Sequence, residues 1–186
     1  QTRLWVAEGA QCPLPLGPEY LYVGYYASAE WNCFLSLGWD LPTRIIDLYP
    51  EYRRMTNGAA GHTMRSGYGL LAAAEAFGIA AMDANYKTDM RELIISGGPW
   101  SPEQQNDILE YCAEDVEITG NLFREMWPKI ATDQLALTQA LLRGRYTVAV
   151  AKMEFSGTPV DTELFAGLML YWPELCLHLI EAVDQD

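Results

Sequence analysis

The chain has 186 residues, half of them apolar, and a formal net charge of -13. It can bury a sizeable core, so we expect one globular domain with an attachment. The charge argues against a large basic nucleic-acid-binding surface over the whole chain. It does not exclude a nucleic-acid enzyme, because a carboxylate site for divalent cations is itself acidic. No apolar run approaches the roughly 20 residues that span a bilayer, so we expect no membrane partner.

The ends and the cysteines give two further expectations. The chain starts at Gln1 with a strand-like segment, Thr2 to Val6, and ends in helical sequence, so we expect that it is cut at both ends. Its four cysteines show no paired metal-ligand spacing, which favours reduced thiols in a cytoplasmic protein. They are Cys12, Cys33, Cys112 and Cys176, and the patterns around Cys33 and Cys112 predict buried helical faces.

After the first strand, strands and helices alternate. Residues 12–18 are rich in Pro and Gly, which excludes a helix or an interior strand. Aromatic and β-branched residues predict strands over 20–26 and 44–48. Between them we expect a helix from Ala29 to about Leu37, with Ser28 as its N-cap and Gly38 at its end. A loop should follow over residues 57–67.

The second half of the chain is predicted to be helical. Helices are expected over 68–77, 88–96, 101–127 and about 133–156, and a final one, capped by Asp161, through Val183. Ser101 and Gln104 form a capping box for the third of these helices, and Pro128 should end it because proline has no N–H to donate. Pro173 should kink the last helix. Together the elements predict an α/β fold, a small mixed sheet with flanking helices.

Tyr111 and Asp115 are four residues apart in a predicted helix and therefore lie on one face of it. Ile118 and Leu122 continue the same stripe, which places Asp115 where a core-facing apolar side chain would normally lie. A half-buried acid needs a partner. A metal ion, an arginine or a set of backbone donors would each serve, and the residues alone leave a metal role and a structural role about equal.

Glu30 is the second carboxylate of interest. It lies in the first turn of a helix that starts just after a strand, where backbone N–H groups and the helix dipole favour its ionised form. A carboxylate held this way can bind a metal ion. An acid in the first turn is also ordinary helix chemistry, and the residues alone favour that simpler explanation.

Two motifs resemble parts of one enzyme family. The segment Tyr111-Cys112-Ala113-Glu114-Asp115 resembles the third motif, Tyr-x-x-x-Asp, of the RNase H-like 3'-to-5' exonucleases. The segment from Glu154 to Asp161 resembles the Glu-x-x-Gly-x-x-(Ile/Val)-Asp signature that opens the polymerase domain of family A DNA polymerases. Residues 25–31 and 44–49 are further similar to a DNA polymerase I-like branch, so the resemblance covers nearly the whole chain.

The resemblance implies a proofreading site in which four carboxylates hold two ions, Mg²⁺ or Mn²⁺. Asp115 would ligate a metal and Tyr111 would orient the attacking water. Glu30 matches the Asp of the second motif and Tyr26 its Asn, so both depart from the family pattern. The first motif, Asp-x-Glu, does not occur before Glu30, and we expect it upstream of Gln1. Asp47 matches a position that more often supports local structure than metal.

Three basic residues near the polymerase motif are weaker candidates for contacts with DNA phosphates. They are Arg143, Arg145 and Lys152, for which a solvated helix face is the simpler explanation. The domains that the resemblance implies are an exonuclease domain over 1–131 and, over 132–186, a linker helix with the first helices of the polymerase thumb.

We therefore expect a fragment of a DNA polymerase I-like enzyme whose partners are the single-stranded 3' end of DNA and, in the parent protein, a primer-template. The parent should hydrolyse phosphodiesters by two-metal catalysis. This fragment should not polymerise and should cleave poorly, because half of the metal shell is absent. Two alternatives stay open: a non-catalytic exonuclease-like scaffold module of a polymerase, and an RNase D-like ribonuclease, which shares the Tyr-x-x-x-Asp motif.

Overall fold

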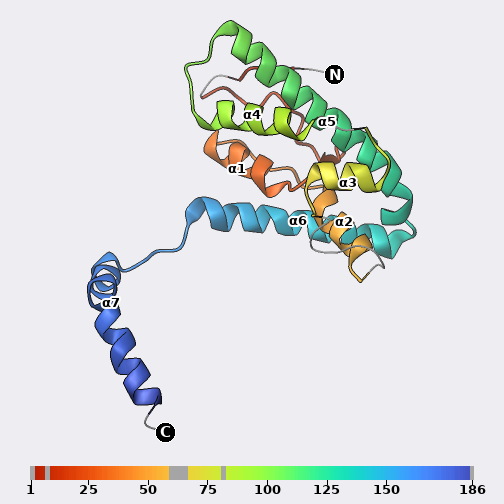
Figure 1. Ribbon diagram of the computed structural model, residues 1–186. Helices are drawn as coiled ribbons and strands as arrows, with labels where there is room; N and C mark the ends of the chain where they lie inside the picture. Colours follow the sequence, from red (N-terminus) through yellow and green to blue (C-terminus); the bar gives the residue numbers. More distant parts are fainter. Residues whose placement is uncertain (1–2, 7–8, 59–66, 81–82, 185–186) are drawn as a thin grey trace. The chain divides into compact units, whose positions relative to one another are not determined.

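The computed structural model describes residues 3–6, 9–58, 67–80 and 83–184. Contacts divide the chain into two compact units, Gln1–Phe155 and Ser156–Asp186 (Figure 1). The first unit contains the sheet and the helices from α1 to α6, and the second contains α7. The boundary expected between residues 131 and 132 falls at the turn before α6, inside the first unit. The assignment of the two parts to an exonuclease and a polymerase domain stays a prediction.

Two short parallel strands form the sheet of the first unit. β1 (Tyr22–Gly24) pairs with β2 (Ile45–Asp47) in the register Tyr22 to Ile45, Val23 to Ile46 and Gly24 to Asp47. Both strands lie inside the segments predicted as strands, so the two predictions are confirmed, although each strand is shorter than predicted. The prediction of a strand over Thr2 to Val6 is wrong for the described residues of this segment, since residues 3–6 are not in a strand.

The described residues therefore form a mostly helical α/β structure around a two-stranded parallel sheet, smaller than the mixed sheet that the sequence predicts. An RNase H-like fold remains part of the proposal below. In the first unit the helices are α1 (Ser28–Ser36), α2 (Leu48–Thr56), α3 (Leu70–Ala76), α4 (Ala84–Ile95), α5 (Pro102–Ile130) and α6 (Gln134–Ser156).

Helix α2 is the element that the sequence pattern misses. It begins at Leu48, directly after β2, because the Asp47 carboxylate accepts a hydrogen bond from the Tyr49 N–H and so caps the helix. Capping also differs from the prediction at α1, where Ala27 is the N-cap and Ser28 is a buried first residue. Helix α4 starts four residues earlier than predicted, since Asp83 caps it through the N–H groups of Asn85 and Tyr86. The predicted loop over 57–67 lies mostly outside the described residues.

Helix α5 begins as predicted and ends later. The capping box of Ser101 and Gln104 is present in full. The helix continues through Pro128 to Ile130, so the prediction that Pro128 ends it is wrong. Met126 and Ile130 are fully buried against the core on the same side as Leu122, and this packing holds the last turn despite the backbone hydrogen bond that proline cannot make.

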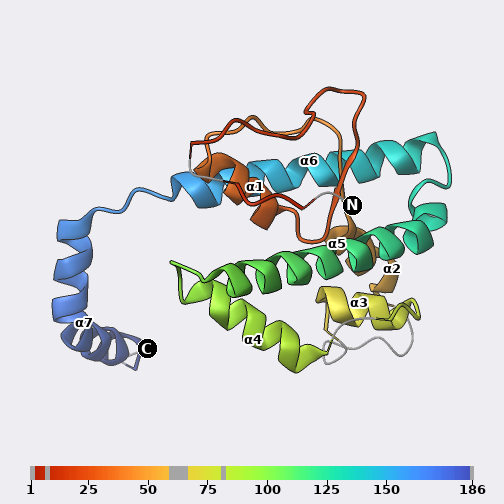
Figure 2. The ribbon, with the colours of Figure 1, turned by 90° about the horizontal axis from the view of Figure 1, so that it is seen from above.

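Neighbouring residues of β2 organise the core on two sides of the sheet, because successive side chains of a strand point to opposite faces. Ile46 belongs to a cluster with Leu122 and Met126 of α5. Ile45 belongs to a second cluster with Trp31 of α1 and Ala151 of α6. Figure 2 shows α6 returning from the end of α5 across the first unit. The sheet is therefore covered by α5 on one side and by α1 and α6 on the other.

The prediction that Cys33 and Cys112 lie on buried faces is wrong, because both residues are exposed. Each lies on an amphipathic helix beside, and not within, its apolar stripe: the buried neighbours are Phe34 on α1 and Ala113 on α5.

Helix α6 approaches the sheet closely at Gly144, where a Cβ atom would overlap the carbonyl oxygen of Ile45. Two polar contacts hold the helix at this point. The Arg143 guanidinium pairs with the buried Glu51 carboxylate, with 3.0 Å between Nη2 and Oε2, and the Trp31 indole N–H donates to the Thr147 hydroxyl at 3.0 Å. From the sequence, Gly144 is only a residue that a helix can tolerate. The packing of α6 on β2 requires a residue without a side chain at this position.

The second unit consists mainly of α7 (Thr162–Val183), which Asp161 caps as predicted and which continues through Pro173. None of its residues is buried within the structure. By length and composition alone α7 is long and apolar enough to cross a membrane, contrary to the expectation that no such segment exists. Length and composition alone do not assign α7 to a membrane.

We expect Gly144→Ala to lower the free energy of unfolding by about 1 to 3 kcal/mol, because the methyl group forces α6 away from β2. Gly120→Ala is the matched control, since Gly120 lies within α5 and a Cβ there meets nothing within 4 Å. It should leave stability unchanged or raise it by up to about 1 kcal/mol. Urea unfolding followed by circular dichroism measures both, and equal effects of the two substitutions would contradict the packing described above.

Candidate functional site

The turn after β1 positions Glu30, and the buried carboxylate of Asp47 holds that turn in place. Asp47 Oδ1 accepts from the Tyr26 N–H and Oδ2 from the Ala27 N–H, each at 2.9 Å, in addition to the Tyr49 N–H that it caps. Burial raises the pKa of Asp47, and the three backbone hydrogen bonds oppose that shift. This is the local structural role that the sequence favours for Asp47.

Tyr111 and Asp115 lie on α5 as the stripe predicts, with Ile118 and Leu122 buried further along the same face. The partner of Asp115 is Lys87 of α4, whose Nζ lies 2.7 Å from Oδ1. Both side chains are about three-tenths exposed. The ammonium also lies 5.8 Å from the centre of the Tyr111 ring. The Asp115 carboxylate is thus compensated by a lysine, a partner that the sequence analysis did not consider.

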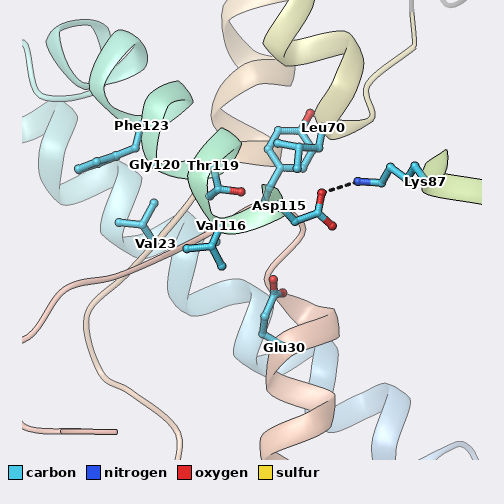
Figure 3. Close-up of a pocket in the computed structure, with 11 residues that line it drawn as sticks. Val23, Glu30, Leu70, Lys87, Asp115, Val116, Thr119, Gly120 and Phe123 are labelled. Carbon is cyan, nitrogen blue, oxygen red and sulfur yellow. Dashed lines mark hydrogen bonds and ion pairs between the residues drawn. The ribbon is translucent and has the colours of Figure 1, made fainter. Parts of the chain in front are cut away.

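A cavity of about 440 Å³ brings Glu30 and Asp115 together, although they lie far apart in the sequence. Figure 3 shows the Glu30 carboxylate on α1 pointing toward that of Asp115 on α5, with Lys87 reaching Asp115 from a third element. Tyr111 does not line this cavity and lies one helical turn before Asp115. The lining residues are Val23, Gly24, Tyr25, Glu30, Leu70, Lys87, Asp115, Val116, Thr119, Gly120 and Phe123.

The surroundings favour protonated side chains at two positions of the site. Desolvation by neighbouring protein atoms, together with the charges of Asp47 and Asp115, raises the pKa of Glu30 to about 7. By accessible surface Glu30 is nevertheless an exposed residue, so solvent screens the energetic effect of this shift and makes it smaller than the pKa alone suggests. Burial, the Asp115 charge and a hydrogen bond to Asp115 raise the pKa of Tyr111 to about 12. The Tyr111 hydroxyl therefore keeps its proton and can donate it in a hydrogen bond at neutral pH.

The described residues offer two carboxylates at this cavity, a number that can serve one divalent ion and is too small for two. Mg²⁺ in proteins is commonly held by one or two carboxylates together with water and substrate phosphate oxygens, and Glu30 and Asp115 provide two carboxylates at one open cavity. Among the described residues no group of three or more His, Cys, Asp or Glu side chains is placed to hold a metal. Lys87 would have to release Asp115 Oδ1 for an ion to bind there.

The weaker DNA-binding candidates do not line this cavity. Arg143 directs its guanidinium to the buried Glu51, so its charge supports the fold. Arg145 and Lys152 are exposed on α6, as a solvated helix face predicts. Tyr26 lies beside the site in the turn held by Asp47, with its ring exposed to solvent.

Sequence reasoning missed Lys87, and one signal could have found it. Helices α4 and α5 are joined by a short connection over residues 96–101 and pack against each other. Such a pair brings the first turns of α4 beside the middle of α5, and Lys87 is the one cation in the segment 84–90. The prediction started this helix at Thr88 and so left Lys87 outside it.

Comparisons with protein-family models, with curated proteins and with solved structures found no match.

We expect Asp47→Ala to lower the free energy of unfolding by about 3 kcal/mol or more, because three backbone N–H groups lose a charged acceptor. Asp83→Ala removes an exposed cap with two such bonds and should cost about 1 kcal/mol. Thermal and urea unfolding of both variants measure the difference. Equal losses would show that Asp47 does not hold the turn after β1.

The raised pKa of Glu30 makes a prediction about pH. Below about 4.5 the carboxyl is protonated in the folded and the unfolded chain, so it gives the free energy of unfolding no pH dependence there. Between about 4.5 and 7 the unfolded chain loses this proton first, so the wild type loses stability as the pH rises, and above 7 the loss is complete.

Glu30→Gln cannot ionise, so the free energy of unfolding of this variant should rise relative to the wild type across that pH window and then stay level. Urea unfolding at a series of pH values, with a chelator present, measures the difference. Glu117→Gln, an exposed residue of α5, is the control and should follow the wild type. If the free energy of unfolding of Glu30→Gln changes with pH as that of the wild type does, the raised pKa of this carboxyl is contradicted.

Proposed function

We propose that the chain is the exonuclease-like part of a DNA polymerase I-like enzyme and that Glu30 and Asp115 form part of a site for the 3' end of a single DNA strand. One observation carries this proposal. The two carboxylates that the motifs single out separately, on α1 and on α5, line the same cavity. A metal site shared by two helices requires that carboxylates far apart in the sequence meet in this way.

Each of four residues has a distinct role in the proposed site. Glu30 and Asp115 would hold a divalent ion, Mg²⁺ or Mn²⁺, which when bound neutralises phosphate charge and activates water. The protonated Tyr111 hydroxyl donates a hydrogen bond close to Asp115, in keeping with the orienting role that the resemblance gives it. Lys87 supplies a positive charge at the cavity that can attract a phosphate.

Hydrolysis by this chain should be slow or absent, because the described residues hold ligands for one ion and the proposed mechanism needs two. The binding of metal and DNA is therefore the more direct test. Mg²⁺ and Mn²⁺ share the ligand preferences of such a site, and Mn²⁺ can be followed by its paramagnetic resonance signal.

We expect Mn²⁺ to strengthen the binding of a 5'-labelled single-stranded oligodeoxynucleotide, measured by fluorescence anisotropy, relative to the same titration with a chelator. Asp115→Asn should weaken Mn²⁺ binding by about tenfold or more, the range that changes around metal sites usually give. Glu117→Gln, on the same helix and exposed, should bind as the wild type does. Unchanged Mn²⁺ and DNA binding in Asp115→Asn would contradict the proposal.

The ion pair between Lys87 and Asp115 favours a second candidate, a non-catalytic exonuclease-like scaffold module of a polymerase. In that case the ammonium permanently takes the place of a metal ion. Lys87→Gln separates the two candidates. It should raise Mn²⁺ affinity if Lys87 only competes for Asp115, whereas a scaffold module should show no Mn²⁺ binding in the wild type and lose stability in the variant.

A further inference from the structure

One exposed tyrosine, two half-buried tyrosines and an exposed arginine lie next to the cavity of Glu30 and Asp115. We define the tyrosine–arginine surface as Tyr26, Tyr49, Arg53 and Tyr68. Two shallow pockets meet on it and share Tyr49 and Tyr68. One, of about 330 Å³, also contacts Tyr26, and the other, of about 460 Å³, also contacts Arg53.

The tyrosine–arginine surface adjoins the cavity of the proposed site, because Tyr25 and Leu70 line both the cavity and the smaller of the two pockets. The Tyr25 hydroxyl donates to the carbonyl oxygens of Tyr68 and Gly69 at this junction. A chain molecule whose end lies at Glu30 and Asp115 would pass over this junction to reach Tyr49 and Arg53.

The backbone of Tyr26 is the most unusual feature of this surface. Among the described residues it is the one non-glycine residue with a positive φ, 65°. This conformation is unfavourable for a bulky residue by about 1 kcal/mol or more, and the Asp47 carboxylate holds it through the Tyr26 N–H. The ring is nevertheless 51% exposed and packs only edge-on against Tyr49, with 5.1 Å between ring centres. The fold thus maintains a strained backbone that presents an aromatic ring to solvent.

Arg53 supplies a positive charge beside these tyrosines. Its guanidinium lies over the rings of Tyr68 and Tyr49, at 5.0 and 5.7 Å from their centres. Within the described part of the chain it forms no ion pair, whereas the neighbouring Arg54 pairs with Glu51. One guanidinium nitrogen, Nη1, also donates to the Tyr49 hydroxyl at 3.5 Å, and the remaining N–H groups are available for an anion.

We propose that the tyrosine–arginine surface binds the nucleotides of a single DNA strand that precede the 3' end, with a base stacked on Tyr26 or Tyr49 and a phosphate on Arg53. Exposed aromatic rings beside arginine are the combination that single-stranded nucleic acids require, because every base has a stacking face and every linkage a negative charge. This inference rests on the proposed function, which places the 3' end in the adjacent cavity.

The test measures binding of a 5'-labelled oligothymidylate of about eight nucleotides by fluorescence anisotropy, with a chelator present, over a range of salt concentrations. Tyr26→Asn removes the ring and suits the positive φ, so it should fold. Arg53→Gln removes the charge. We expect each to weaken binding about fivefold or more, and Arg53→Gln to reduce the slope of log affinity against log salt by about 0.7, the value for one phosphate on a single strand.

Two exposed residues outside this surface provide matched controls. Tyr146→Asn on α6 and Arg124→Gln on α5 make the same chemical changes at exposed positions and should leave affinity unchanged. Circular dichroism melting of all four variants verifies that they fold. Wild-type affinity in both Tyr26→Asn and Arg53→Gln, or an equal loss in the control variants, would overturn the inference.

The two proposals fail in distinguishable ways. If Asp115→Asn loses Mn²⁺ binding while Tyr26→Asn and Arg53→Gln bind DNA normally, the site stands and the tyrosine–arginine surface is refuted. If the surface variants lose DNA while Asp115→Asn behaves as the wild type, the surface binds DNA without an exonuclease site. Equal or tighter binding of RNA of matched sequence would refute DNA as the ligand of the surface.

Discussion

The carboxylate of Asp47 is the interaction on which the rest of the site depends. It accepts three backbone hydrogen bonds from two segments, the turn after β1 and the first turn of α2. The first segment determines where α1 starts, and therefore where Glu30 points, and keeps Tyr26 at a positive φ. The second starts the helix that carries Tyr49 and Arg53. One buried acid thus positions both the cavity and the surface beside it.

The cavity depends equally on a long-range arrangement. Gly144 allows α6 to lie directly on β2, and the ion pair between Arg143 and Glu51 holds it there. With one side of the sheet covered in this way, α5 packs on the other and brings Asp115 across from Glu30. Lys87 then balances the charge of Asp115. The result is a cavity lined by two carboxylates and one lysine, the arrangement on which the proposed function rests.

Sequence patterns predicted those parts of the structure that local chemistry determines. The capping box at Ser101, the stripe of Asp115, Ile118 and Leu122, and the strands around Val23 and Ile46 follow from spacing and residue type, whereas their parallel pairing does not. The parts that failed depend on contacts between distant segments. Helix α2 is an exception, because Asp47 caps it locally through the Tyr49 N–H. Packing of Ile130 carries α5 past Pro128, and Lys87 pairs with Asp115 only because α4 folds back along α5. For the same reason sequence could name Glu30 and Asp115 but not show that they share a cavity.

The central claim is that Glu30 and Asp115 face one another across a single crowded cavity. A carboxyl ¹³C NMR titration of Glu30 in the wild type and in Asp115→Asn tests this most directly. The account predicts that Glu30 titrates near pH 7 in the wild type and at a lower pH in the variant, because the Asp115 charge contributes to the raised pKa. A Glu30 pKa close to the ordinary value of 4.5, unaffected by Asp115→Asn, would contradict it.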